Sequence, residues 1–128
     1  MKKIIFISLL AMVTAVAASA KKNGGVYILG ASVSFSDSIV YFTEVQFVEG
    51  VKLEKGTKFL PERQHYAYLL KDYMAFKEGM PGRTSVIYFS KKESSLRKQE
   101  AKLKKKIQKK GRSVRYLGDK FQFTKPGE

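Results

Sequence analysis

Cysteine is absent from this chain of 128 residues, and histidine occurs once, at His65. The lack of thiols excludes disulfide bonds, thiolate metal sites and a lipid anchor attached through an N-terminal cysteine. A single imidazole does not make a metal site unless carboxylates stand near it, and the sequence indicates no such set. We therefore predict no metal, no cofactor and a domain that is stabilised by its hydrophobic core alone.

Acidic side chains are also scarce, with 11 Asp and Glu against 25 Lys and Arg, which gives a net charge of +14 at pH 7. The excess is not evenly distributed along the chain. Residues 91–128 hold 14 basic and 4 acidic side chains, whereas residues 21–90 hold 9 basic and 7 acidic ones. The last third of the chain therefore carries the charge, and an anionic partner should bind there.

The N-terminus has the three regions of a secretory signal peptide. Two lysines follow the first methionine, an uncharged apolar run covers residues 4–17, and small residues lead up to Lys21. This run is shorter than the roughly 20 residues that span a bilayer as a helix. We predict cleavage between Ala20 and Lys21, with Ala18 and Ala20 as the small residues that the peptidase reads. The alternative is an uncleaved N-terminal anchor.

The predicted export signal divides the chain into three parts. Residues 1–20 are then a cleaved signal peptide, residues 21–124 form one domain, and residues 125–128 are a frayed tail. No transmembrane segment is expected after cleavage. Small secreted domains of eukaryotes usually carry disulfides, so a cysteine-free exported domain indicates a bacterial protein that is periplasmic or secreted.

The first half of the domain is predicted to be rich in β-structure. Apolar and polar residues alternate around Val33 and Phe35, which is typical of a half-buried strand, and turn-forming residues surround Asp37. Residues 39–48 predict a second strand that forms an antiparallel hairpin with the first. Its first four residues are apolar on both faces, which favours a central place in the sheet. Two further short strands are expected at residues 51–53 and 121–124.

Two helices are predicted in the second half. The first should begin at Pro61, because the missing N–H of proline is tolerated in a first turn, and it should end before Gly79. The second should begin at Ser90, which with Glu93 fits a capping box, and continue to about Lys110, with Gly111 as its C-terminal stop. The first helix carries an apolar stripe at helical spacing through Tyr66, Leu69, Leu70, Tyr73 and Met74.

Residues 84–89 and 113–117 predict strands on either side of the second helix. Strand, helix and strand then form a crossover unit with parallel strands. Together with the hairpin, this gives the order β-β-α-β-α-β. We predict a single small α/β domain of the α+β kind, with a mixed, mostly antiparallel sheet of four to five strands and two helices.

The second predicted helix carries a cationic stripe opposite its apolar residues Leu96, Leu103 and Ile107. Such a stripe binds anionic polymers or lipid head groups by displacing their counterions. The alternative is that lysine, a good helix former, simply solvates an exposed face. The stripe, which we predict as the anionic-partner site, consists of Lys91, Lys98, Lys102, Lys105 and Lys109.

The sequence contains no complete catalytic motif. Gly30 to Ser34 is one residue short of the G-x-S-x-G elbow, and no helix follows Ser32. Ser95 and Lys98 match S-x-x-K, but its usual companion motifs are missing. His65 could act as a general base only with a nucleophile within hydrogen-bond reach. We therefore predict that the protein is not an enzyme, with a small hydrolase using Ser32, Ser95 or His65 as the less favoured interpretation.

Several short segments resemble those of small exported proteins of Bacteroidota-type bacteria. They are the strand at residues 30–32, residues 37–43, the entry to the first helix at residues 60–63, and the lysine-rich last helix. The resemblance implies a location in the bacterial envelope. It implies no activity and no site residues.

The sequence supports three hypotheses for the function. The first is a non-catalytic exported protein whose lysine-rich helix binds an anionic envelope polymer, lipid head groups or an acidic protein. The second is a structural or assembly subunit of an envelope complex, since residues 39–42 are doubly apolar and residues 121–124 could leave an open sheet edge. The third is the hydrolase. Nucleic acid is disfavoured as a partner because the chain is exported.

Overall fold

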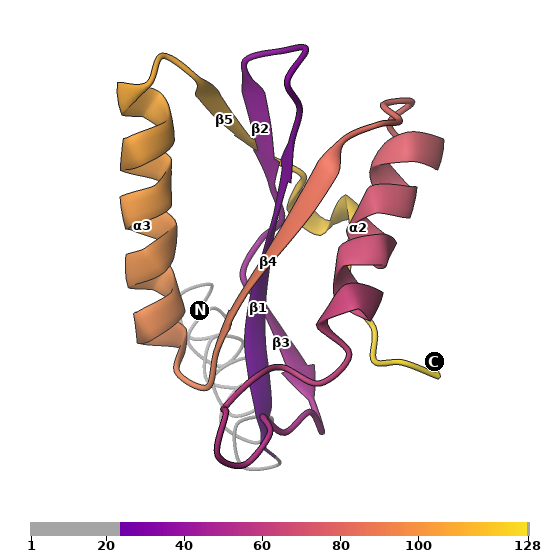
Figure 1. Cartoon of the computed structure of the whole chain (residues 1–128), viewed down its shortest axis with the longest axis vertical. Helices are drawn as coiled ribbons and strands as arrows, with labels where there is room; N and C mark the ends of the chain where they lie inside the picture. The colour runs from indigo at the N-terminus through magenta and orange to yellow at the C-terminus, as the bar shows by residue number, and fades with distance from the viewer. Residues whose placement is uncertain (1–23, 128) are drawn as a thin grey trace, which may run out of the picture.

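Strand β1 (Gly25–Val33) is the central strand of a mixed five-stranded sheet that has one helix on each face (Figure 1). The structure, a computed structural model, describes residues 24–127. The predicted α+β class, the mixed sheet, the two helices and the order of elements are confirmed within this range. The other elements are β2 (Ile39–Phe42), β3 (Gln46–Glu49), α2 (Arg63–Phe76), β4 (Thr84–Ser90), α3 (Glu93–Lys109), β5 (Ser113–Tyr116) and a 3-10 turn at Gly118–Lys120.

The predicted signal peptide and its cleavage residues Ala18, Ala20 and Lys21 lie outside the described residues. Neither described helix is long and apolar enough to cross a membrane. The predictions of export and of cleavage therefore remain predictions from the sequence.

Strand β1 is paired along both of its sides. It runs antiparallel to β4 on one side and antiparallel to β2 and β3 on the other, and β5 runs parallel to β2. Strands β4 and β5 are thus parallel to each other, as the strand–helix–strand pattern predicts, although β1 and β2 lie between them. Strand β4 pairs with no other described strand, so its outer side is an open edge.

A β-bulge divides the long strand predicted at residues 39–48 into β2 and β3. The register with β1 changes by one residue between the two strands, so residues 29–30 of β1 face residues 43–45. Thr43 is fully buried here, and its Oγ1 accepts the N–H of Gly30 at 2.9 Å, in place of a strand carbonyl. The prediction of one continuous strand is wrong because this inserted residue interrupts the ladder.

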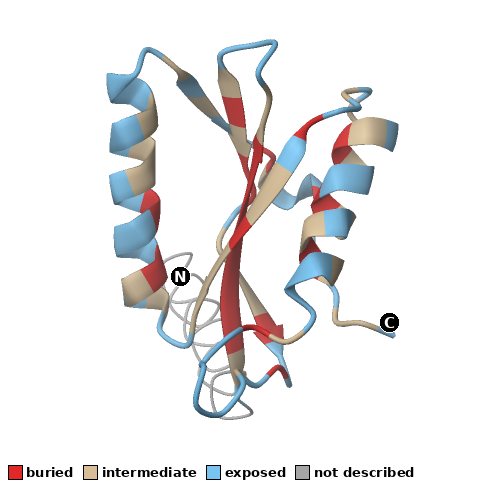
Figure 2. Ribbon diagram, viewed as in Figure 1, coloured by how far each residue is buried: buried red, intermediate tan, exposed pale blue. Residues whose placement is uncertain are grey.

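The side chains of β1 alternate between two hydrophobic cores, one under each helix. Val26 and Ile28 belong to the core under α2, and Tyr27 and Leu29 belong to the core under α3. Figure 2 shows that β1 is buried along almost its whole length. Burying an aliphatic side chain of this size contributes about 1.5–3 kcal/mol to folding. The apolar run of β1 therefore joins both layers of the domain.

The strands predicted at residues 51–53 and 121–124 are not formed. The C-terminal segment instead inserts Phe121 and Phe123 into the core under α2, where their exposures are 5% and 7%. The side-chain amide of Gln46 donates to the Phe121 carbonyl at 2.9 Å and accepts the Phe123 N–H at 2.7 Å. One amide side chain thus satisfies the backbone groups that a neighbouring strand would otherwise pair.

Both helices begin later than predicted. Helix α2 starts at Arg63 because Glu62 has a left-handed backbone conformation, with φ 53°, that a helix does not continue. Helix α3 starts at Glu93, and Ser90 Oγ accepts the N–H of Lys92 at 3.1 Å. The predicted capping box is therefore wrong, since Ser90 stabilises the turn before the helix and does not cap the helix itself.

A buried arginine fixes the loop between β1 and β2. Arg83 is 5% exposed, and its guanidinium donates to Asp37 Oδ2 at 2.7 Å, to Ser32 and to the Ile39 carbonyl. It also lies 5.0 Å from the ring centre of Tyr41. Asp37 Oδ1 accepts the Ile39 N–H at 3.0 Å, which confirms Asp37 as a turn former. This backbone bond first, and then Arg83, hold the pKa of the Asp37 carboxyl below its ordinary value against the opposing effect of burial.

Candidate anion-binding surface

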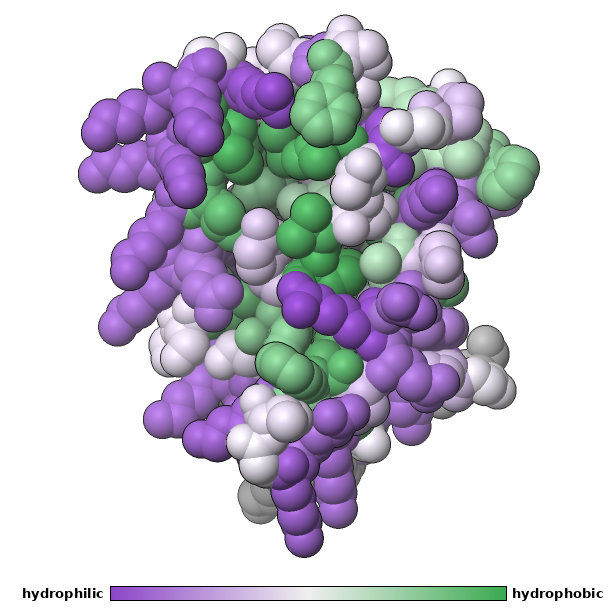
Figure 3. All heavy atoms as spheres, in the orientation of Figure 1, coloured by the Kyte–Doolittle hydropathy of each residue, from purple (hydrophilic) through white to green (hydrophobic). Residues whose placement is uncertain are grey.

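Helix α3 packs on the sheet through one narrow apolar face. Leu96 is fully buried, and Leu103 and Ile107 are half-buried against the core that also contains Phe42. Because α3 turns 100° per residue, the lysines on the opposite side of the helix face solvent. These are Lys98, Lys102, Lys105 and Lys109, which are all exposed and which we call the lysine face. Figure 3 shows long hydrophilic side chains projecting from the side of the molecule where α3 lies.

The carboxylates of α3 are used by an arginine and a tyrosine. Arg97 lies 3.4 Å from Glu93 and 3.3 Å from Glu100. Glu100 is 8% exposed and also accepts the Tyr116 hydroxyl at 2.7 Å. Burial first, and then the contact with Glu100, raise the pKa of Tyr116 well above its ordinary value. No member of the lysine face has an ion pair with a carboxylate of residues 24–127, so its charge is uncompensated there.

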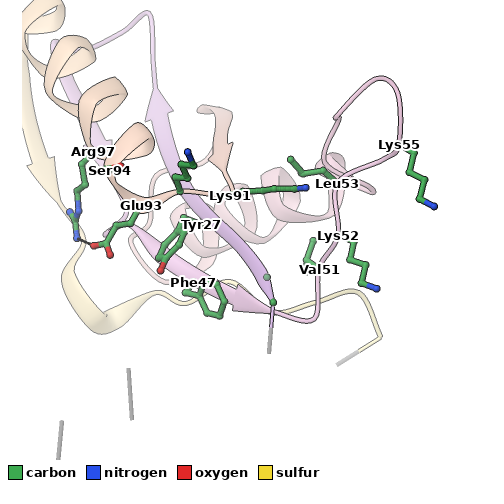
Figure 4. Close-up of a pocket in the computed structure, with 13 residues that line it drawn as sticks. Tyr27, Phe47, Val51, Lys52, Leu53, Lys55, Lys91, Glu93, Ser94 and Arg97 are labelled. Carbon is green, nitrogen blue, oxygen red and sulfur yellow. Dashed lines mark hydrogen bonds and ion pairs between the residues drawn. The ribbon is translucent and has the colours of Figure 1, made fainter. Parts of the chain in front are cut away.

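Lys91 does not belong to the lysine face. It precedes the first residue of α3, and it lines a hollow of about 940 Å³ at the beginning of β1 (Figure 4). The structure therefore keeps four of the five predicted site residues together and places the fifth at a second cationic site. The sequence placed Lys91 on the helix only because the capping box was assigned at Ser90.

The hollow is formed by three separate parts of the chain. Its floor includes Tyr27 of β1 and Phe47 of β3, whose ring centres are 4.9 Å apart. Basic side chains line it from the loop after β3, from the turn before α3 and from α3 itself. They are Lys52, Lys55, Lys91, Lys92 and Arg97. Sequence reasoning missed this site because the loop residues gain their significance only when the fold brings them to the start of α3.

Two of the three residues considered for hydrolysis, Ser32 and His65, hold other parts of the fold together. Ser32 is fully buried, and its Oγ accepts from Arg83 Nε at 3.0 Å. His65 Nε2 lies 2.8 Å from the Thr124 carbonyl, so the ring nitrogen is the donor and ties the C-terminal segment to α2. Ser95 is half-buried near the start of α3. No hydrogen bond in the described part of the chain joins any two of these three residues.

No group of three or more His, Asp or Glu residues in the described range is placed to hold a metal ion. Comparisons with protein-family models, with curated proteins and with solved structures found no match for this chain. The function must therefore be inferred from the geometry of the two cationic sites.

Proposed function

We propose that the protein is an exported, non-catalytic binding protein of the bacterial envelope that holds an anionic partner on the lysine face. The observation that carries the proposal is the uncompensated charge of Lys98, Lys102, Lys105 and Lys109, since Arg97 occupies both carboxylates of the same helix. An exposed ion pair contributes only about 0.2–1 kcal/mol. Useful affinity therefore needs several pairs at once.

The length of the lysine face favours an extended partner. Lys98 and Lys109 are eleven residues apart in α3, which corresponds to about 16 Å of helix at 1.5 Å per residue. A single small anion cannot contact charges over that length, whereas an acidic polymer, a layer of lipid head groups or an acidic protein surface can. Because Leu96 is buried against the sheet, a contact with lipid would be electrostatic and superficial, without insertion of α3.

A salt series on the mature chain, residues 21–128, tests the proposal. We expect binding to immobilised heparin and to vesicles of anionic lipid, with an affinity that falls steeply as salt increases. The triple variant Lys98→Glu, Lys102→Glu and Lys105→Glu should lose most of this binding. The matched control is Lys71→Glu, Lys77→Glu and Lys120→Glu, which changes the net charge equally at exposed positions away from the lysine face. Equal binding by the two triple variants would contradict the proposal.

Export has its own test. Expression of the full chain in a bacterial host should give a periplasmic or secreted product whose intact mass begins at Lys21. The variant Ala20→Arg should block cleavage, because the peptidase needs a small residue at that position. A product that keeps its first 20 residues in the wild type would support the uncleaved anchor instead.

The open edge of β4 favours assembly as a second candidate function. Its seven residues are mostly β-branched, aromatic or small, and none is charged. Arg63 partly shields this edge, since its guanidinium donates to the Ile87 carbonyl and lies 5.5 Å from the ring centre of Phe89. Charged side chains at such edges hinder pairing with other chains. The open edge predicted at residues 121–124 is not formed, so β4 replaces it in this hypothesis.

Light scattering distinguishes the candidates. If β4 is an assembly edge, Arg63→Ala should increase self-association at high concentration, whereas Arg115→Ala on β5 should not. A strictly monomeric protein in both variants would exclude assembly through this edge.

A further inference from the structure

The hollow at the start of β1 combines an apolar floor with a cationic rim. Tyr27 and Phe47 lie side by side on its floor (Figure 4), with their rings tilted by 54°, and Val51 and Leu53 add aliphatic surface. Its volume of about 940 Å³ lies within the range of small-molecule sites, which is about 300–1,000 Å³. The site is therefore large enough for a ligand with a substantial apolar part.

A glycine keeps the floor open. A side-chain carbon at Gly25 would lie 2.6 Å from Phe47 Cζ and 2.5 Å from the Val48 carbonyl oxygen. Any larger residue would displace the Phe47 ring from its place against Tyr27. The aromatic floor thus depends on the absence of a side chain at position 25.

The basic residues of the rim come from a loop, a turn and a helix. Lys52 and Lys55 come from the loop after β3, Lys91 and Lys92 from the turn before α3, and Arg97 from the helix. Glu93 is the only carboxylate among the described lining residues. It lies 3.4 Å from Arg97, so the four lysines around the floor have no carboxylate of their own in the lining.

We infer that this hollow binds an amphiphilic anion, in which an apolar body contacts the aromatic floor and a phosphate, sulfonate or carboxylate group contacts the lysines. A simple inorganic anion would gain nothing from the apolar floor. A neutral apolar molecule would gain nothing from the rim, and a cation would be repelled. This site shares no residue with the lysine face and is independent of the function proposed for it.

Fluorescence of anilinonaphthalene sulfonate, which has an aromatic body and one sulfonate, tests the inference on the mature chain. We expect saturable binding that dodecyl phosphate displaces, whereas inorganic phosphate and dodecyl maltoside do not. The double variant Lys52→Glu and Lys91→Glu should weaken dye binding roughly tenfold, because two favourable charge contacts become repulsive. Each variant must also show a cooperative unfolding transition in urea, because this dye binds partly unfolded chains as well.

The matched control is Lys98→Glu with Lys102→Glu, which has the same change in charge on the lysine face. It should bind the dye as the wild type does and lose heparin binding, whereas the rim variant should keep heparin binding. Failure at one site is thus distinguishable from failure at the other. The inference is overturned if the rim variant and the control bind the dye equally, or if inorganic phosphate or dodecyl maltoside displaces it as well as dodecyl phosphate does.

Discussion

Arg83 Nη1 lies 2.7 Å from Asp37 Oδ2, and the arginine side chain is 3% exposed while that of the aspartate is 41% exposed. The pair joins the loop after β1 to the residue before β4. A buried guanidinium is stable only when its donors are satisfied, and here one carboxylate, one hydroxyl and two backbone carbonyls provide the acceptors. The loop between β1 and β2 is therefore held by the start of a strand that lies far away in the sequence.

This pair makes stability depend on acid pH. The pKa of Asp37 is held below its ordinary value of 3.8, so the ionised carboxylate is favoured in the folded protein. Its contribution is present above pH 3.8 and is lost as pH falls through the lower, folded value. We expect Asp37→Asn to unfold at lower urea concentration than the wild type at neutral pH. The difference between the two midpoint concentrations should shrink as the pH falls below 3.8 and through the folded-state pKa of Asp37. A constant difference from neutral to strongly acid pH would contradict the assignment.

The bulge provides a second prediction. Thr43→Val keeps the shape of the side chain but removes the acceptor of the buried Gly30 N–H. Leaving such a donor unsatisfied costs about 1–3 kcal/mol. Urea unfolding should show a loss of this size, whereas Thr57→Val, at an exposed loop position, should change stability by less than about 0.5 kcal/mol. Equal effects of the two substitutions would show that Thr43 Oγ1 is not a structural acceptor.

The C-terminal segment should be part of the cooperative fold. Phe123 is 7% exposed and its ring centre lies 4.9 Å from that of Phe121. Phe123→Ala should lower the free energy of unfolding by about 3–5 kcal/mol, the usual cost of removing a buried ring. Phe35→Ala is the matched control, because Phe35 is fully exposed at 101%. If the two variants are equally stable, the segment does not pack as described.

The hydroxyl of Tyr73 should lose its proton at a higher pH than an ordinary tyrosine does. Burial first, and then the hydrogen bond that its hydroxyl donates to Glu78 at 2.7 Å, raise its pKa from 10 to about 12. A folded-state pKa above the ordinary value means that its contribution to stability is present below pH 10 and is lost as pH rises through about 12. The tyrosinate absorbance of the wild type minus that of Tyr73→Phe should show this midpoint. Glu78→Gln should move it toward 10, and an unmoved midpoint would leave burial as the sole cause.

Hydrophobic periodicity was sufficient to predict the order of elements and the two faces of α3. The 3.6-residue period alone places Lys98 and Lys102 opposite Leu96, and the structure has them there. Lys91 was misplaced because a capping box is judged from residue types, whereas the actual start of the helix depends on the backbone conformation of Lys92. What the lysine face binds stays a prediction.

The division of residues 39–48 into β2 and β3 is visible in the hydrophobic pattern of the sequence. Val40 and Phe42 are both even-numbered, yet Val45 and Phe47 pack in the same core under α3, so the alternation changes phase between them. This phase change is the signature of a bulge. It could be interpreted only once the two faces of the sheet were known, because Val48 is apolar as well and belongs to the other core.

The C-terminal segment and the hollow could not be predicted by local patterns. The alternation of Phe121 and Phe123 matches a strand, but Gln46, 75 residues before Phe121, supplies the hydrogen bonds that decide its conformation. In the same way, nothing in the sequence around Lys52 and Lys55 indicates that these loop lysines line a binding site. Their proximity to Lys91 is a property of the tertiary fold.

The bond between Thr43 and Gly30 has a consequence for how the chain finds its fold. The chain must select one strand alignment as it folds, and it has no disulfides to stabilise the correct one. A hairpin displaced by one residue would bury the Gly30 N–H without the Thr43 acceptor and turn the side chains of the displaced strand toward the opposite core. The inserted residue thus favours the observed alignment of β2 and β3 on β1 over one that is displaced by a residue.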